Sequence, residues 1–424
     1  MNIKMIKTKK LDCGTTIVME HIPYVQSAAL GIWVRAGSVD ETEDLAGVSH
    51  YIEHMMFKGT ENRTARDIAY DVEKIGGQFN AFTGKEATCY YIKTVADSLE
   101  AGAEILLDMV LNSVMDPEEM EKERNVIFEE MKMIQDTPDD DVHDMIAELV
   151  FKGHPLGQPI IGTVESLSGI DREKLTGYLQ REYTRDSIVI ALAGNFDEEK
   201  MCSIFEERML KLQPSKPEKK VNAKPYEKGF RVKAKDIEQS HLCLAVPGIP
   251  YDHELYYALG LLNNVFGGSM SSRLFQNIRE EKGLAYAVYS STNSYSNHGF
   301  FNIYAGVSHD KVEDAIAGIR EELEILKRDG ITEEELAMAK EQMKSTYIFA
   351  QENVSTRMFS IGKNMTVMGM IQTPEEVIKG YNAVTMDDIA RAAEIICDMD
   401  KYCAALVTNK EVDLKAIMEK KHEN

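Results

Sequence analysis

Alternating apolar and polar positions near the N-terminus predict short strands, and a three-to-four-residue apolar spacing further on predicts helices. The alternation covers Lys4–Lys10, Thr15–Glu20 and Ser27–Arg35, which we expect to be three strands. A helix is expected over Ala46–Phe57. A second helix begins at Thr64 and ends at a Gly-Gly pair, since threonine is a favourable N-cap and glycine commonly closes a helix.

The pattern continues through the first half of the chain with a hairpin and long helices. Asp116 followed by proline marks the start of one long helix, because proline is tolerated in the first helical turn. The further elements expected before residue 212 are the hairpin strands Gln78–Phe82 and Ala87–Thr94, the helices Asp97–Ser113, Pro117–Gln135, Asp141–Phe151 and Asp197–Leu210, and the strand Ser187–Leu192.

A change of composition near the middle of the chain predicts a domain boundary. Residues 213–225 contain three prolines and four lysines with little apolar surface to bury, which is typical of a linker. The halves on either side repeat an order of strands, helix, hairpin and paired long helices, which indicates an internal duplication. We therefore expect two homologous domains, residues 1–212 and 229–424, joined by a linker over residues 213–228.

The composition is that of an ordinary soluble protein and narrows the function classes. The 424 residues are 44% hydrophobic and 28% charged, enough for the cores of two to three domains. A net charge of −22 argues against nucleic-acid binding, which needs an excess of Lys and Arg. We find no membrane span and no cleaved signal peptide. For that reason we also expect no membrane partner. The six cysteines are scattered, so we expect reduced thiols and a cytoplasmic location.

The sequence His50-Tyr-Ile-Glu-His54, inside the predicted 46–57 helix, indicates a metal site. On a helix His50 and His54 lie one turn apart on the same face, where both imidazoles reach one metal ion. Glu53 projects beside the pair and can hold a water there without ligating the metal, as in a reversed zinc-protease helix. On the pentapeptide alone, the alternative is two surface histidines on an amphipathic helix.

A third metal ligand has to come from another helix. Glu123 and Glu130 are seven residues apart, about two turns, and share a face of the predicted 117–135 helix. A glutamate there would complete a His/His/Glu set, although for any one glutamate of so acidic a helix a solvated surface charge is the alternative. The corresponding segment of the second half has His253 without a partner histidine four residues on. One metal site per chain is therefore expected.

Four segments spread over essentially the whole chain resemble the pitrilysin/insulinase family of zinc metallopeptidases. Within that family the resemblance is to the mitochondrial processing peptidase subunits and their single-chain bacterial relatives. The segments are the metal helix His50–Thr60, the strand motif Gly77–Thr83, the acidic helix segment Glu121–Met131 and the second-half signature Arg279–Tyr286. The resemblance implies a peptidase with one bound zinc ion per chain.

The resemblance also implies roles for individual residues at the metal. His50, His54 and Glu130 would bind the zinc ion, and Glu53 would act as general base. Glu123 would be a supporting carboxylate behind the site.

Substrate would be held by two further groups of residues, according to the same resemblance. The edge strand that would pair with the peptide contains Phe79, Asn80, Ala81 and Phe82. Arg279 and Tyr286 would hold the substrate carbonyl and stabilise its tetrahedral oxyanion. In family members with four such domains in one polypeptide, the Arg/Tyr pair that meets the zinc belongs to the opposite half of the molecule. The resemblance therefore implies a homodimer with shared active sites around an enclosed chamber.

The sequence therefore predicts an α+β protein of two homologous domains, each an antiparallel sheet with helices packed on one side. The predicted function is a zinc endopeptidase that hydrolyses unfolded or short peptides. The main alternative is a catalytically silent core-type subunit of the same fold, but such subunits usually lose the ligand set that this chain keeps. A metal-binding module without hydrolytic activity would not need Glu53, Arg279 and Tyr286 together.

Overall fold

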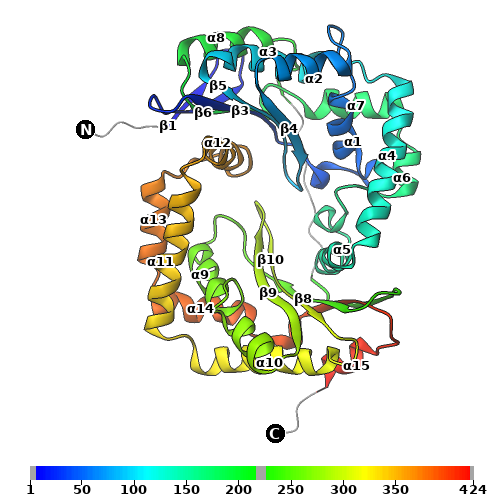
Figure 1. Ribbon diagram of the computed structural model, residues 1–424, viewed down its shortest axis with the longest axis vertical. Coiled ribbons are helices and arrows are strands. Elements are labelled where there is room, and N and C mark those ends of the chain that lie inside the picture. The colour runs from blue at the N-terminus through cyan, green and yellow to red at the C-terminus, as the bar shows by residue number, and fades with distance from the viewer. Residues whose placement is uncertain (1–5, 216–225, 421–424) are drawn as a thin grey trace. The chain divides into compact units, whose positions relative to one another are not determined.

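The computed structural model describes residues 6–215 and 226–420, which form two compact units (Figure 1). The first unit comprises Met1–Met131, Gln158–Val221 and Ile348–Thr373, and the second comprises Lys132–Gly157, Asn222–Tyr347 and Pro374–Asn424. The units therefore differ from the contiguous halves 1–212 and 229–424, because each includes one segment from the other half. Most of the predicted linker, residues 216–225, lies outside the described residues.

A six-stranded sheet forms the centre of the first unit, in the order β1-β2-β6-β3-β5-β4. Neighbouring strands are antiparallel except β2 and β6, which run parallel. Strand β4 lies at the edge and pairs only with β5. The strands are β1 (Ile6–Lys10), β2 (Thr16–His21), β3 (Ser27–Val34), β4 (Gln78–Thr83), β5 (Thr88–Val95) and β6 (Ile188–Gly194).

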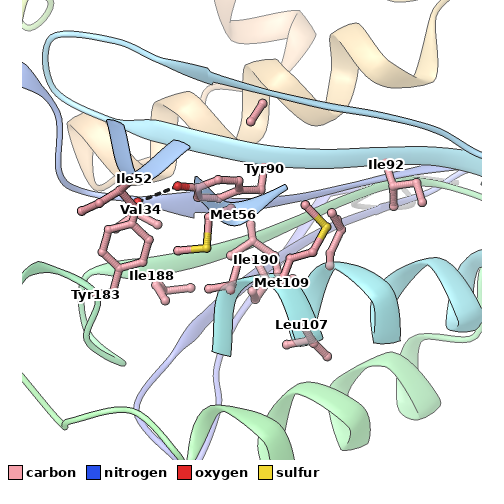
Figure 2. Packing of buried hydrophobic residues seen from close by; sticks show 14 of the residues in the cluster. Val34, Ile52, Met56, Tyr90, Ile92, Leu107, Met109, Tyr183, Ile188 and Ile190 are labelled. Carbon is pink, nitrogen blue, oxygen red and sulfur yellow. Dashed lines mark hydrogen bonds between the residues drawn. The ribbon is translucent and has the colours of Figure 1, made fainter. Parts of the chain in front are cut away.

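Both faces of this sheet are packed. On one face the strands and helices bury a large apolar core, in which the hydroxyl groups of Tyr90 and Tyr183 form a hydrogen bond of 2.7 Å (Figure 2). On the other face Trp33 and its neighbours pack against α12 (Val354–Lys363). The other helices with residues in this unit are α1 (Val48–Met56), α2 (Ala65–Lys74), α3 (Leu99–Asn112), α4 (Pro117–Asp136), α6 (Val164–Ser168), α7 (Arg172–Glu182) and α8 (Glu198–Met209).

The five-stranded sheet of the second unit repeats the topology of the first. Its order, β7-β11-β8-β10-β9, corresponds strand for strand to β2-β6-β3-β5-β4, and β7 and β11 form its parallel pair. The repeated order supports an internal duplication. The strands are β7 (Phe230–Ala234), β8 (Ser240–Pro247), β9 (Ala285–Ser294), β10 (Gly299–Val307) and β11 (Cys403–Thr408).

Helix α5 (Pro138–Val150) covers β8 and β11 in the second unit, as α12 covers the sheet of the first. Glu148 of α5 forms an ion pair with Arg231 of β7, and the His143 ring stacks on the Tyr304 ring at 5.3 Å. The other helices with residues in this unit are α9 (Tyr256–Phe266), η5 (Leu274–Glu281, π-helical), α10 (Val312–Asp329), α11 (Glu333–Ala350), α13 (Pro374–Ala383), α14 (Met386–Ile396) and α15 (Leu414–Glu419).

The predicted α+β class with two helix-packed sheets is confirmed, but two details of the prediction are wrong. The sheets are not fully antiparallel, because β6 lies parallel to β2 and β11 lies parallel to β7. Helices do not pack on one side only, because α12 and α5 cover the second faces. Within the described part of the chain, no helix is both long and apolar enough to cross a membrane.

Candidate metal centre

The helix that carries His50 and His54 is α1, and its buried face holds it firmly in the first unit. Tyr51 donates a hydrogen bond of 2.5 Å to the Met120 carbonyl of α4, which fixes α1 against the helix that carries the acidic candidates. The residues of α1 that are buried in the core are Val48, Tyr51, Ile52, Met55 and Met56. The two histidines lie on the opposite, half-buried side.

The first turn of α1 is capped by a residue outside the helix. The N-cap residue, Gly47, has a φ of 89° and no side chain with which to cap. The buried Glu41 carboxylate accepts hydrogen bonds from the N–H groups of Gly47 at 2.7 Å and Ser49 at 2.8 Å. Burial nevertheless raises the pKa of Glu41 to about 7. Glu41 therefore satisfies two backbone donors that the start of a helix leaves without partners.

Three ligand atoms converge between α1 and α4. Nε2 of His54 lies 3.5 Å from Oε2 of Glu130, and Nε2 of His50 lies 3.9 Å from the same oxygen. Together, His50, His54 and Glu130 offer ligand atoms that all lie within 4.8 Å of one another. Metal–ligand bonds of about 2 Å in a tetrahedron put ligand atoms about 3.3 Å apart, so the observed spacing fits a zinc-sized ion.

The protonation state of His50 also suits metal binding. Burial, with a contribution from the nearby His54, lowers the pKa of His50 to about 4. A histidine with so low a pKa is neutral at physiological pH and keeps a lone pair for a metal.

Glu123 lies directly behind His54. Its Oε2 is 3.1 Å from Nδ1 of His54, while its Oε1 pairs with the Lys58 ammonium at 2.6 Å. A carboxylate on the second ring nitrogen fixes the tautomer that leaves Nε2 free for a metal. On α4 Glu123 shares the buried stripe with Met120 and Ile127, which explains why it lies next to α1.

Glu53 does not belong to the three-residue ligand group and has a different partner. Its Oε2 accepts a 2.5 Å hydrogen bond from the hydroxyl of Thr83, the last residue of β4. Burial raises the pKa of Glu53, against the opposing effects of the Thr83 hydroxyl, His54 and the Thr83 backbone N–H. Its carboxylate therefore lies at one end of the edge strand.

The edge strand β4 offers its outer side for backbone pairing. The Gly84 N–H donates a hydrogen bond of 2.8 Å to the Ala87 carbonyl, and in an antiparallel pair every second residue of a strand is bonded to its partner strand in this way. By this alternation, the backbone groups of Phe79, Ala81 and Thr83 face away from β5. Asn80 Oδ1 accepts the Ala81 N–H at 2.8 Å.

Comparisons with known proteins assign this arrangement to a family. Residues 16–164 match the family described as insulinase (peptidase family M16), and residues 169–343 match the family described as peptidase M16 inactive domain. The "Uncharacterized zinc protease YmxG" of Bacillus subtilis is 41% identical over 95% of this chain and 98% of its own length. This chain belongs to peptidase family M16. An "Uncharacterized zinc protease" of Rickettsia felis is 38% identical over 91% of this chain and 94% of its own length.

Solved M16-like structures share the fold of the chain. A peptidase M16 inactive domain from Pseudomonas fluorescens aligns with a TM-score of 0.89 at 18% identity, covering 96% of this chain and 98% of the other. A protease from Helicobacter pylori aligns with a TM-score of 0.87 at 22% identity, covering 95% and 99%. The family membership and the convergent ligand atoms agree with a zinc protease ancestry.

The remaining predicted site residues of this M16 chain, Arg279 and Tyr286, lie in the second unit. Arg279 is near the end of η5 and Tyr286 is the second residue of β9. The guanidinium carbon of Arg279 lies 4.6 Å from the centre of the Phe275 ring and 5.7 Å from that of the Tyr286 ring. Tyr286 is 74% exposed. The pair is thus adjacent and open to solvent.

Three residues that support the site were missed by sequence reasoning: Glu41, Lys58 and Thr83. Lys58 and Thr83 lie inside the quoted motifs, so each could have been suspected as a partner of a neighbouring carboxylate. Glu41 carries no such signal, because its two hydrogen bonds depend on how the loop before α1 folds back.

Proposed function

We propose that this chain is a zinc-dependent endopeptidase that hydrolyses unfolded or short peptides. The observation that carries the proposal is the convergence of His50, His54 and Glu130 within 4.8 Å, with Glu53 on the same helix turn and β4 beside it. The names of the relatives as zinc proteases support the choice of metal.

His50, His54 and Glu130 would hold one zinc ion per chain, and Glu123 would orient His54 from behind. When bound, zinc would supply Lewis acidity and lower the pKa of a water molecule in the site. The ion pair with Lys58 holds the Glu123 carboxylate in place. The ligand imidazoles are thus preorganised on a helix that is packed into the core.

Glu53 would act as the general base. It lies beside the ligand group without being part of it, and it would take a proton from the attacking water and pass it to the leaving nitrogen. Burial raises the pKa of Glu53, which makes its carboxylate a stronger base than an exposed one.

An extended peptide would bind along the open side of β4. The outward backbone groups of Phe79 and the carbonyl of Ala81 would pair with it, since the Ala81 N–H donates to Asn80 Oδ1. The side chains of Asn80 and Phe82 would lie beside the bound peptide. A folded domain has no free strand to offer, so we expect cleavage of extended peptides and little cleavage inside folded cores.

We propose further that Arg279 and Tyr286 contact the substrate carbonyl within a homodimer with shared active sites. This step rests on the resemblance, by which the pair of one subunit would lie over the metal helix of the other. Mixing the inactive variants Glu53→Gln and Tyr286→Phe would then restore part of the activity, since one site of a mixed dimer has both groups intact. If subunits exchange and no activity returns, the shared site is refuted.

The six cysteines all belong to the described residues, where they are buried and free, and we propose a reducing, cytoplasmic location on this basis. A catalytically silent subunit remains the second candidate, because residues 169–343 match a family named as an inactive domain. That match does not include the metal helix, and all proposed ligands lie in residues 16–164.

Metal analysis combined with a quenched-peptide library tests the proposal. We expect about one zinc per chain, cleavage that stops after chelation and returns with zinc, and near-empty sites in His50→Ala and His54→Ala. Glu129→Gln, a change of an exposed glutamate adjacent to Glu130, is the control and should keep both zinc and activity. Full zinc occupancy in either histidine variant would refute the ligand assignment.

A further inference from the structure

Thr83 joins the edge strand to the proposed general base. Its hydroxyl donates to Oε2 of Glu53 at 2.5 Å. Within the described residues, this hydrogen bond ties the Glu53 side chain to the last residue of β4. The orientation of the carboxylate therefore depends on the position of the strand end.

The register of β4 determines which of its backbone groups face outward, next to the contact between Thr83 and Glu53. The outward-facing backbone groups belong to Phe79, Ala81 and Thr83, because every second residue of the strand pairs with β5. The Ala81 N–H donates to Asn80 Oδ1 at 2.8 Å, so a bound peptide would pair with the backbone groups of Phe79 and with the Ala81 carbonyl. Its next residue along the edge would then lie beside the Glu53 carboxylate.

The end of β4 is itself held in place by a loop that also holds α1. The N–H groups of Ser38 and Val39 donate to the carbonyls of Gly84 and Lys85, at 3.2 and 2.9 Å, in the turn that follows Thr83. Three residues further on, Glu41 caps the first turn of α1. The same short loop therefore fixes both the strand end with Thr83 and the helix with Glu53.

We propose that Thr83 is a positioning residue that sets the orientation of the Glu53 carboxylate relative to the substrate strand. The inference rests on the proposed function, since it assigns Thr83 a task in that reaction. Thr83 is not part of the group of metal ligands found among the described residues. Its task is to hold the base in a single orientation at the point where the peptide passes the metal centre.

The test compares Thr83→Val, which removes only the hydroxyl, with Thr83→Ser, which restores it. For Thr83→Val we expect kcat to fall about 10–100-fold, the usual effect of losing a supporting hydrogen bond, with KM and zinc content unchanged. Thr83→Ser should keep most of the wild-type kcat. Crystals of Thr83→Val should show the Glu53 side chain in more than one orientation.

Thr88→Val is the matched control. Thr88 lies directly opposite Thr83 in the hairpin, and its hydroxyl donates to the Ala36 carbonyl at 2.9 Å, away from Glu53. It should keep the wild-type kcat. The inference is overturned if Thr83→Val keeps the wild-type kcat, loses zinc, or behaves like Thr88→Val. If the wild-type protein with zinc cleaves no peptide, the proposed function fails instead, and the crystal structures still show whether Thr83 orients Glu53.

Discussion

Replacing Glu41 by glutamine should make the stability of the first unit depend less on pH. Glu41 is 2% exposed, and burial raises its pKa from 4.5 to about 7 in the folded protein. Because the folded state binds the proton more tightly, its contribution to stability is fully present below pH 4.5. It is lost as the pH rises through 7.

The size of the effect follows from the shift in pKa. A change of roughly 2.5 units corresponds to about 3 kcal/mol, at 1.36 kcal/mol per unit, spread between pH 4.5 and 7. Glutamine is neutral at every pH and cannot contribute this slope. The hydrogen bond lost from the N–H of Gly47 or Ser49 adds a cost to the variant that is the same at every pH.

Urea unfolding of both proteins without metal, from pH 5 to 8, measures the effect. The fluorescence of Trp33 reports on the first unit, because it is the single tryptophan of the chain and is 2% exposed there. The difference in unfolding free energy between the two proteins should shift by about 3 kcal/mol in favour of Glu41→Gln as the pH rises. His50 and other titrating groups are present in both proteins and cancel. A difference that stays constant with pH would refute the reasoning.

Two further predictions concern Glu123, which lies behind the ligand His54, and the packing of helix α12. Glu123→Ala should weaken zinc binding about 10–100-fold, because the His54 ring loses the carboxylate that orients it. Glu121→Ala, on the exposed side of α4, is the control and should leave zinc binding unchanged. Competition with a chelator measures the zinc affinity of both variants. Gly362→Ala should lower the unfolding free energy by about 1–3 kcal/mol, since its new Cβ would lie 2.1 Å from Nε1 of Trp33. Gly177→Ala, which meets open space, is the control, and equal stability of these two glycine variants would contradict the packing.

The local elements and the pairing of His50 with His54 could be predicted from short spacings in the sequence, whereas the choice of Glu130 as third ligand came from the family resemblance. The helix expected over 46–57 is α1, Val48–Met56, and the hairpin strands fall within one or two residues of their expected ends. The one-turn spacing of His50 and His54 places both rings on one face of α1. Glu123 and Glu130 share a face of α4, so both glutamates lie next to α1.

The position of α12 and α5 could not be predicted in the same way. An apolar stripe such as that of Val354, Met358 and Ile361 shows that a helix is buried, but not against which sheet. Each of these two helices packs on the sheet formed mainly by the other half of the chain, so the two compact units are not contiguous in sequence. The parallel strand pairs could not be predicted for the same reason, because each pairs strands that are far apart in the sequence.

The measurement that tests the central claim most directly is the zinc content and peptide turnover of Glu53→Gln, determined on the same preparation as the wild-type protein. Glutamine keeps the shape of the side chain but cannot take a proton, so the account predicts equal zinc in both proteins. Turnover should fall about 10²–10⁴-fold in the variant. Wild-type turnover in a fully zinc-loaded Glu53→Gln protein would contradict the account.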